Sequence, residues 1–315
     1  MMIIVNRDKK ERDHMRKREG MKKRRSRILA WLLACFMVLS VIQGTGWGSL
    51  TVQAEEEVKR PVNLELGAAN VINDGKVGET EGDGWSYNAV TNTLTLTNAK
   101  LGDIIYDGGD LNLQINGDNT VGKIDAENSD AAYITGIENG TDKAKLHCEH
   151  DISVGALTVN NIELNVEGYI DMAGSGSDGR TVSLENVKLY VKGHIDANTI
   201  SCSGSQINTA DRVSVWGSLN CVDSEIRAGK IDFSTIKGTY TNSIVVDNQN
   251  NTTRIYGAAT LCEELKIPSA GTIMFAKGAS ITNLDKLTVE EDANIFVNYK
   301  MDEYGSESYE KHTHN

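Results

Sequence analysis

The stretch LTVNNIELNVEGYID (residues 157–171) is followed 25 positions later by VSLENVKLYVKGHID (182–196). When the two are aligned, their apolar residues coincide, and within each segment apolar and polar residues alternate. GYID and GHID close the two segments, and GKID occurs at 122–125 and again at 229–232. A repeat of about 20 residues with an apolar side chain at every second position is typical of stacked β-strands in a solenoid.

Further segments continue the repeat in both directions. ISCSGSQINTADRVSV begins at Ile200, 18 positions beyond the start of the second segment, and LNCVDSEIRAGKIDF begins at Leu219, 19 positions later. LKIPSAGTIMF (265–275) matches LTVEEDANIFV (287–297) at a spacing of 22, and LTLTNAKL (94–101) has the same form upstream. Each coil leaves an apolar face that only a neighbouring coil can bury, so we expect like residues to stack at about 4.8 Å.

The segments between the predicted strands are rich in Gly, Asn, Asp and Ser. A leucine-rich repeat shares the period but needs a Leu-rich consensus and a helical return. We therefore predict an all-β fold, a single-stranded parallel β-helix (solenoid) of about ten rungs between Leu94 and Asn298, preceded by a signal-peptide helix.

Two bends recur in the predicted coils. The first holds residue types that tolerate a left-handed backbone, namely Asn98, Asn161, Asn186, Gly204 and Asp223. The second holds the glycines of the repeated tetrapeptide, Gly122, Gly168, Gly193 and Gly229. After each of these glycines we expect the Ile to point inward and the Asp to face solvent. The tetrapeptide thus recurs because each coil turns the same corner.

The N-terminal segment is typical of an export signal. A basic stretch (22–27) precedes an apolar stretch (28–42), and a Val-x-Ala cleavage site ends at Ala54. We predict a signal peptide with an N-terminal extension over residues 1–54. An uncleaved anchor is the alternative, although 15 apolar residues are fewer than the about 20 that span a bilayer.

The rest of the chain divides into three parts. Residues 55–83 form a polar lead-in, which we expect to cap the open end of the solenoid because terminal repeats require a cap. Residues 84–300 form the β-helix, which begins with a hairpin-like turn at Thr91-Asn92. Residues 301–315 lack apolar periodicity and are expected to be a disordered tail.

Charge excludes several classes of partner. Residues 1–54 carry 12 of the 32 Lys/Arg and 4 of the 44 Asp/Glu, which leaves 20 basic and 40 acidic residues in the predicted mature chain. Such an acidic chain disfavours nucleic acid and anionic membrane as partners. It is typical of an exported protein, which we expect to be a monomer.

Four cysteines follow the predicted signal, and all occupy positions of inward-facing apolar residues: Cys148, Cys202, Cys221 and Cys262. We expect buried, unpaired thiols at these positions. Cys202 and Cys221 fall on adjacent rungs, where they could also reach disulfide distance.

The stretch GWSYNAVTNTLTLTNA (84–99) followed by GGDLNLQINGDNTV (108–121) resembles the opening of a family of secreted Gram-positive bacterial surface proteins. These are largely uncharacterised parallel β-helix proteins of the carbohydrate-binding domain-containing type. The resemblance rests on the following residues: Trp85, Tyr87, Thr93, Leu94, Leu96, Asn98, Gly109, Asp110, Leu111, Leu113, Gly117, Asn119 and Val121. It implies a cell-surface protein and glycan binding, and it supplies no catalytic motif.

A column of aspartates is the candidate metal site. Asp171 and Asp196 should lie on neighbouring rungs about 5 Å apart, where two carboxylates repel unless a cation lies between them. Ca²⁺ is the candidate cofactor. The alternative is a solvated face, in which basic residues two positions before each aspartate neutralise the column.

Exposed rings are the candidate sugar-binding groups. Tyr169 and Tyr190 are expected to face outward on adjacent strands, His194 precedes the aspartate column, and Trp216 lies near a bend. Flat exposed rings stack on sugars. The segment HCEHD (147–151) is read instead as a polar surface, because no partner on another rung is apparent.

These observations favour a secreted, non-enzymatic protein of the cell surface that binds a glycan or another extracellular partner. A structural spacer or adhesin stalk is one alternative. A polysaccharide lyase or glycoside hydrolase is the other, with Arg212 beside the aspartates as its only indication.

Overall fold

A computed structural model describes residues 61–137, 143–172, 180–232, 239–301 and 307–311. The predicted signal peptide, the first residues of the lead-in (55–60) and most of the Gly/Ser-rich segment MAGSGSDGRT (172–181) lie outside the described residues. The described chain is a β-solenoid of about ten turns, and within it the only helical element is the 3₁₀ turn η1 (Leu284–Lys286). None of its helical segments reaches the length and apolarity needed to cross a bilayer.

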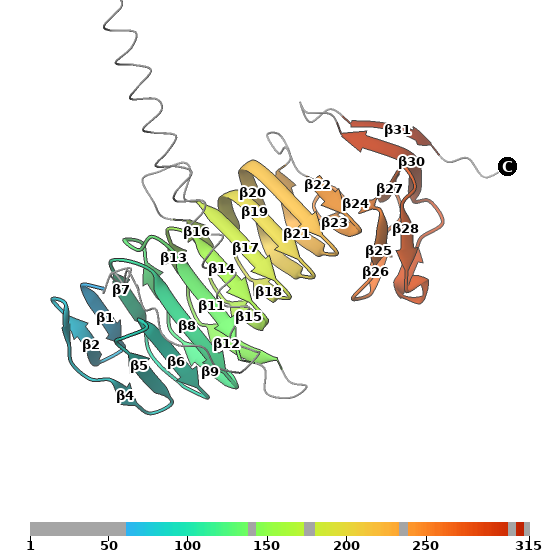
Figure 1. The fold of residues 1–315 in the computed structure, drawn as a ribbon. Coiled ribbons are helices and arrows are strands. Elements are labelled where there is room, and N and C mark those ends of the chain that lie inside the picture. The colour runs from blue at the N-terminus through green and yellow to red at the C-terminus, as the bar shows by residue number, and fades with distance from the viewer. Residues whose placement is uncertain (1–60, 138–142, 173–179, 233–238, 302–306, 312–315) are drawn as a thin grey trace, which may run out of the picture. The chain divides into compact units, whose positions relative to one another are not determined.

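The solenoid has three faces, each made of strands that stack in parallel from coil to coil (Figure 1). Face A contains β6 (Thr93–Thr97), β8 (Leu111–Asn116), β11 (Ala132–Gly136), β14 (Leu157–Asn160), β17 (Thr181–Glu185), the end of β19 (Ile195–Ser203), the end of β20 (Gln206–Val222) and β22 (Thr239–Thr241). Face B contains β9 (Asp118–Val121), β12 (Ala144–Cys148), β15 (Ile162–Val166), β18 (Lys188–Val191), the start of β20, the start of β21 (Glu225–Asp232) and β23 (Ser243–Asp247).

Face C completes each coil and carries the Ile-Asp of the repeated tetrapeptide. It contains β7 (Ile104–Asp107), β10 (Ile124–Ala126), β13 (Ile152–Val154), β16 (Ile170–Met172), the start of β19, the middle of β20 and the end of β21. The predicted register is confirmed: Ile170 pairs with Ile195, and Asp171 pairs with Asp196. DRVS (211–214) occupies the position of the tetrapeptide in the coil between GHID and the second GKID, since Ser214 lies between Asp196 and Asp232.

The first bend has the predicted left-handed backbone. Its φ angles lie between 48° and 56° at Asn98, Asn161, Asn186, Gly204 and Asp223. The side chains at this bend also bond along the stack, because Asn186 Nδ2 donates to Asn161 Oδ1 at 3.2 Å and Asn242 Nδ2 donates to Asp223 Oδ1 at 2.9 Å. Asn and Asp satisfy both demands because they tolerate positive φ and carry a short polar group, whereas Gly204 satisfies only the first.

Buried serines reinforce the same bend in the later coils. Ser205, Ser224 and Ser243 each follow the left-handed residue and are almost fully buried. Each hydroxyl donates to a carbonyl two residues earlier and accepts the N–H of a residue in the preceding coil. The backbone groups that the bend removes from the sheet are thereby satisfied.

The glycines of the second bend are required by close packing, since their φ angles are not positive. A Cβ on Gly122 would collide with the carboxylate of Asp103, which accepts the backbone N–H of Lys123 at 3.0 Å. Asp151 makes the same contact two coils later, accepting the N–H of Tyr169 at 3.0 Å. The tetrapeptide therefore begins with Gly because the preceding coil occupies the space of a side chain.

The described part of the lead-in forms the strands β1 (Asn63–Leu66), β2 (Ala69–Asn73), β3 (Lys76–Val77) and β4 (Glu81–Gly82). With β5 (Trp85–Asn88), from the start of the range predicted as β-helix, they make an N-terminal cap with antiparallel pairing. β1 pairs with β7, and β5 forms a hairpin with β6 through the predicted turn at Asn92, whose φ is 49°. Beneath this hairpin, Asn92 accepts the hydroxyl proton of Tyr87 at 2.9 Å and donates to the hydroxyl of Tyr106 at 3.0 Å. The cap is thus closed by a buried polar network.

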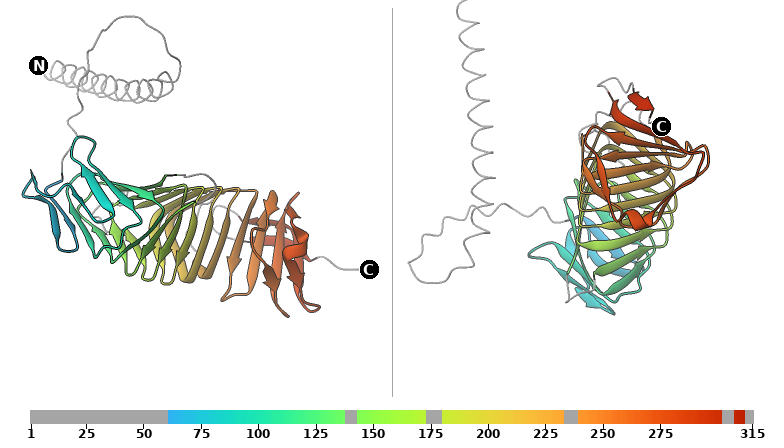
Figure 2. Two further views of the ribbon diagram at one scale, coloured as in Figure 1. Left: turned by 90° about the horizontal axis from the view of Figure 1, so that it is seen from below. Right: turned by 90° about the vertical axis from the view of Figure 1, so that its right-hand side faces the viewer.

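The direction of the strands reverses after β23. β24 (Thr252–Tyr256) returns antiparallel to β23, and parallel stacking then resumes in a second set of coils. This set contains β25 (Ala258–Thr260), β26 (Leu265–Ile267), β27 (Thr272–Ala276), β28 (Ser280–Thr282), β29 (Leu287–Val289) and β30 (Asn294–Met301). The range 84–300 is therefore two parallel stacks joined by a hairpin. The strands of the second stack are the orange and red ones in Figure 1 and Figure 2.

Two expectations are wrong in this C-terminal part. Cys262 is exposed, because the inward residue of its corner is the preceding Leu261, which is fully buried. The repeat partner of Cys262, Leu284, is likewise 64% exposed. Residues 307–311, expected in a disordered tail, form β31 (Glu307–Lys311) antiparallel to β30. The buried guanidinium of Arg254 binds Glu307 and thereby holds β31 in place.

Substituting Gly122 by Ala should lower the free energy of unfolding by about 1–3 kcal/mol, because the new methyl group displaces the Asp103 carboxylate from Lys123. Chemical denaturation would measure this cost. In an Asp103→Ala background the same substitution should cost clearly less, since the remaining contacts are with backbone atoms at 3.1 Å. Equal costs in the two backgrounds would contradict the steric explanation.

Burial raises the pKa of Tyr106 from 10.0 to about 12. Folded and unfolded chains both keep this phenol neutral below pH 10, so its contribution to stability is constant there. Between pH 10 and 12 the unfolded chain releases the proton first, and the free energy of unfolding should fall. Urea denaturation between pH 10 and 12 measures this decrease in the free energy of unfolding. The decrease should be smaller in Tyr106→Phe. It should be unchanged in Tyr309→Phe, because Tyr309 is 47% exposed.

Candidate functional site

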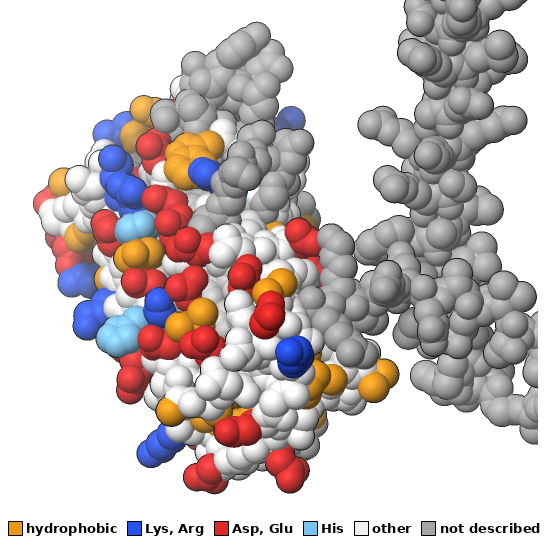
Figure 3. Space-filling view, turned by 90° about the vertical axis from the view of Figure 1, so that its left-hand side faces the viewer, with side chains coloured by type: hydrophobic (Ala, Val, Ile, Leu, Met, Phe, Trp, Pro, Cys, Tyr) orange, Lys and Arg blue, Asp and Glu red, His pale blue; other side chains and the backbone are white. Residues whose placement is uncertain are grey.

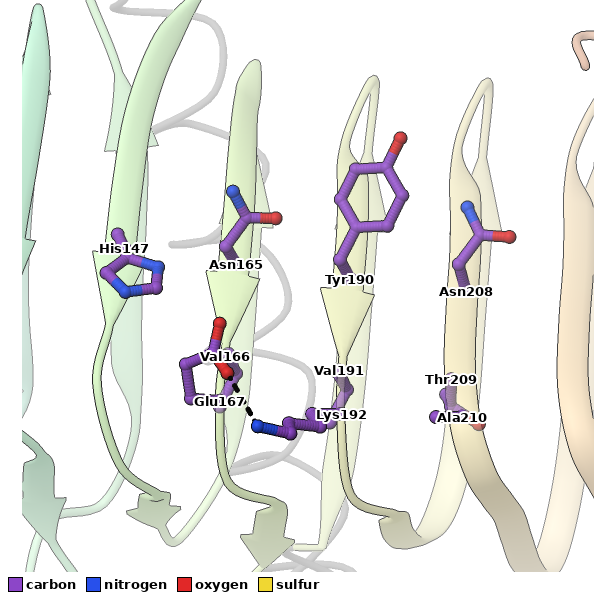
Figure 4. A pocket seen from close by; sticks show the side chains of 10 residues that line it. All are labelled: His147, Asn165, Val166, Glu167, Tyr190, Val191, Lys192, Asn208, Thr209 and Ala210. Carbon is purple, nitrogen blue, oxygen red and sulfur yellow. Dashed lines mark hydrogen bonds and ion pairs between the residues drawn. The ribbon is translucent and has the colours of Figure 1, made fainter.

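A shallow groove of about 580 Å³ crosses four strands of face B (Figure 4). It spans the ends of β12, β15 and β18 and the start of β20, and it is the candidate functional site. Its lining residues are His147, Asn165, Val166, Glu167, Tyr190, Val191, Lys192, Asn208, Thr209 and Ala210.

One row of outward side chains runs along the groove. His147 pairs in register with Asn165, Asn165 with Tyr190, and Tyr190 with Asn208. Figure 4 shows these four side chains side by side on neighbouring strands. Each follows a buried apolar residue in its strand, so the same alternation that fills the core turns them outward. The row offers an imidazole, two amides and a phenol at intervals of about 4.8 Å.

Tyr190 is held in place by two charged neighbours. The ammonium of Lys188 lies 5.0 Å from the centre of its ring, and its hydroxyl donates to Glu263 Oε1 at 3.3 Å. Lys188 and Glu263 also form an ion pair at 3.3 Å. Hydrogen bonding to Tyr190, and then to Glu263, raises the pKa of Lys188. The ring is therefore held in one orientation.

The row ends at Arg227, which pairs in register with Asn208. The Arg227 guanidinium donates to the carbonyl oxygens of Glu264 at 2.6 Å and Glu263 at 3.1 Å. Glu225 is buried beside it and accepts the N–H of Cys262 at 3.3 Å. The segment around residues 262–264 is thus attached to face B and bounds the row of polar side chains.

Charges along the groove are paired. Lys192 and Glu167 form an ion pair at 3.2 Å, shown as a dashed line in Figure 4, although both side chains are largely exposed. Glu167 is the only carboxylate among the residues that line the groove. Acidic, basic and histidine side chains are likewise interspersed on the side of the molecule drawn in Figure 3. The four side chains of the row itself include no carboxylate, ammonium or guanidinium group.

The four predicted binding residues do not share one site. Tyr190 lines the groove, whereas Tyr169 and His194 lie at the entrance to face C and stack on each other, with ring centroids 5.1 Å apart and planes 3° from parallel. Each ring therefore covers a face of the other. Trp216, at the bend between faces C and A, is 50% exposed and has Arg180 lying 5.8 Å from its ring centre.

The aspartate column is interrupted and partly neutralised. Ser153 separates Asp125 from Asp171, and Ser214 follows Asp196. Asp196 accepts from Arg212 Nη2 at 3.1 Å, and His194 Nε2 lies 3.7 Å from the same oxygen. In the described residues, no three His, Cys, Asp or Glu side chains gather in a way that could hold a metal. Arg212 thus pairs with one oxygen of Asp196, whose side chain is only 16% exposed. The Ca²⁺ site and the alternative of a solvated, neutralised face both stay predictions.

Most of the groove residues are not among the site residues predicted from the sequence. The prediction for His147 is a polar surface, and Asn165 and Asn208 are not predicted site residues. The signal was nevertheless present, because HC, NV, YV and NT occupy equivalent positions in four consecutive coils, each a polar residue before an inward one. The polar positions that align from coil to coil therefore predict the row, as the aligned apolar positions predict the core.

Comparison of the chain with protein-family models, with curated proteins and with solved structures gave no match.

Millimolar Ca²⁺ should leave the melting temperature unchanged, because Arg212 already neutralises Asp196. Thermal unfolding in Ca²⁺ and in a chelator measures this directly. A rise of several degrees with Ca²⁺ that disappears in both Asp171→Asn and Asp196→Asn would instead establish the metal site. Asp232→Asn, in the same column but separated from Asp196 by Ser214, is the matched control.

Proposed function

We propose that this chain is an exported, non-enzymatic binding protein of the cell surface, and that the face B groove takes an extended, uncharged polysaccharide. The observation that carries the proposal is the row of His147, Asn165, Tyr190 and Asn208 along one groove. Export is supported by the basic and apolar segments and the cleavage site that end at Ala54.

The chemistry of the row favours a sugar polymer. Amide, imidazole and phenol groups donate and accept hydrogen bonds without net charge, as hydroxyl-rich ligands require. The repeat of about 4.8 Å between rungs places one such group against each successive unit of an extended chain. Tyr190 adds a flat ring to the row, and such rings bind the apolar faces of sugars. The paired charges at the groove edges give no preference for an anionic or cationic polymer.

An enzymatic role has weaker support. Hydrolysis of a glycosidic bond uses two carboxyl groups on either side of the scissile bond. The groove contributes one, Glu167, and it is paired with Lys192. A lyase or hydrolase is therefore the less favoured alternative for this site.

A structural spacer is the second candidate function. It is favoured by the continuous ladder of apolar residues and by the stacked Tyr169 and His194, whose rings cover each other. Such a protein would need no ligand, so binding experiments separate it from the first proposal.

Tyr190→Ala should weaken glycan binding by about tenfold or more, because the ring and its hydroxyl are lost from the centre of the row. A glycan array identifies the ligand, and isothermal calorimetry then compares the variants. Asn165→Ala should also weaken binding, whereas Tyr133→Ala, at a 38% exposed tyrosine on face A, should not. Indifference of the folded wild-type protein to every glycan tested would refute the proposal and favour the spacer.

A further inference from the structure

Two cysteines lie one above the other inside face A. Cys202 and Cys221 are register partners on the adjacent strand segments of β19 and β20, and both are buried. Their Sγ atoms are 3.1 Å apart. Adjacent strands are separated by about 4.8 Å, which falls within the Cα separation that a disulfide requires. The backbone therefore already has the spacing of a cross-linked pair.

The position of the pair in the column is specific. The earlier coils place Val159 and Leu184 at this inward position, and the next coil places Tyr240 there. Two smaller thiols follow in succession between these larger side chains. A disulfide would fill the same apolar column without adding a polar group.

We propose that Cys202 and Cys221 are a cross-linking site, at which a disulfide joins two consecutive coils. The two thiols lose two protons and two electrons as the S–S bond forms. A low-molecular-weight disulfide such as oxidised glutathione accepts the electrons and is reduced to two thiols. Hydrogen bonding from Cys221 lowers the pKa of Cys202, which favours Cys202 as the thiolate that attacks first.

The other two cysteines of the described chain lack such a partner. Cys148 is buried on face B, where its thiol donates to the carbonyl of Gly122 at 3.2 Å, and burial raises its pKa to about 11. Cys262 is exposed on the corner segment that follows β25. The geometry thus selects one pairing among the four cysteines.

The cross-link would act on a short stretch of chain. It would close a loop between residues 202 and 221, so in the unfolded state it restricts one coil. Loops of this size reduce the entropy of the unfolded chain enough to raise the melting temperature of a domain of this length by about 6–10 °C.

Peptide mapping tests the proposal on the full chain. After refolding in a glutathione redox buffer, free thiols are blocked under denaturing conditions and the protein is digested with trypsin without reduction. Cleavage after Lys192, Arg212 and Arg227 places Cys202 in residues 193–212 and Cys221 in residues 213–227. The expected species is these two peptides joined, two hydrogen masses lighter than their sum, and separated by reduction.

Variants test the thermodynamic consequence. The melting temperature of the wild type should fall by about 6–10 °C on reduction. The double variant Cys202→Val and Cys221→Val, which keeps the column apolar, should show no redox dependence, whereas Cys262→Ser should behave as the wild type. Blocked, unlinked 193–212 and 213–227 peptides from folded protein in oxidising buffer would overturn the proposal, as would linkage of either peptide to Cys148 or Cys262.

Discussion

The stacking of like apolar residues on like, coil above coil, is the constraint on which the rest of this structure depends. Each coil contributes inward side chains from three faces, and none of these faces is buried within its own coil. The backbone hydrogen bonds that fix the spacing also run between coils. Because the core contacts and the hydrogen bonds both run along the stack, a single register error would displace both. The apolar residues stay in register from β6 to β23, and the two register shifts, between Ala197 and Thr199 and between Thr209 and Arg212, fall at the bends between faces.

Register is secured at the corners rather than along the strands. One corner needs a residue that tolerates positive φ, and there Asn161 and Asn186 also bond to each other along the stack. The other corner needs the absence of a side chain, because a carboxylate or carbonyl of the preceding coil fills that space. These demands are local, which explains why the strands vary in sequence while the corners recur.

Much of the fold could be predicted because period and alternation are visible in a single chain. The pairings of Leu157 with Val182 and of Ile170 with Ile195 follow from alignment alone. The reversal after β23 could not be read this way, since a hairpin at 248–251 leaves the repeat downstream nearly unchanged. The predicted binding residues do not lie together for a related reason. The prediction rests on residue type, because it names exposed rings. The groove is instead formed by outward side chains that pair in register on neighbouring strands, and among the predicted binding residues only Tyr190 is one of these.

The strand β23 has a consequence for how the protein can be divided. All five of its residues are buried, with Val245 in the core of the first stack and Ile244 and Val246 in the core of the second. The two stacks therefore share the strand β23 and are not interchangeable modules. A fragment ending at Asp247 would present a bare apolar surface beside an unpaired strand edge, the combination that promotes aggregation. A rearranged or truncated protein that keeps only one stack would have to retain β23. It would also need new residues to bury the apolar side chains that the other stack covers.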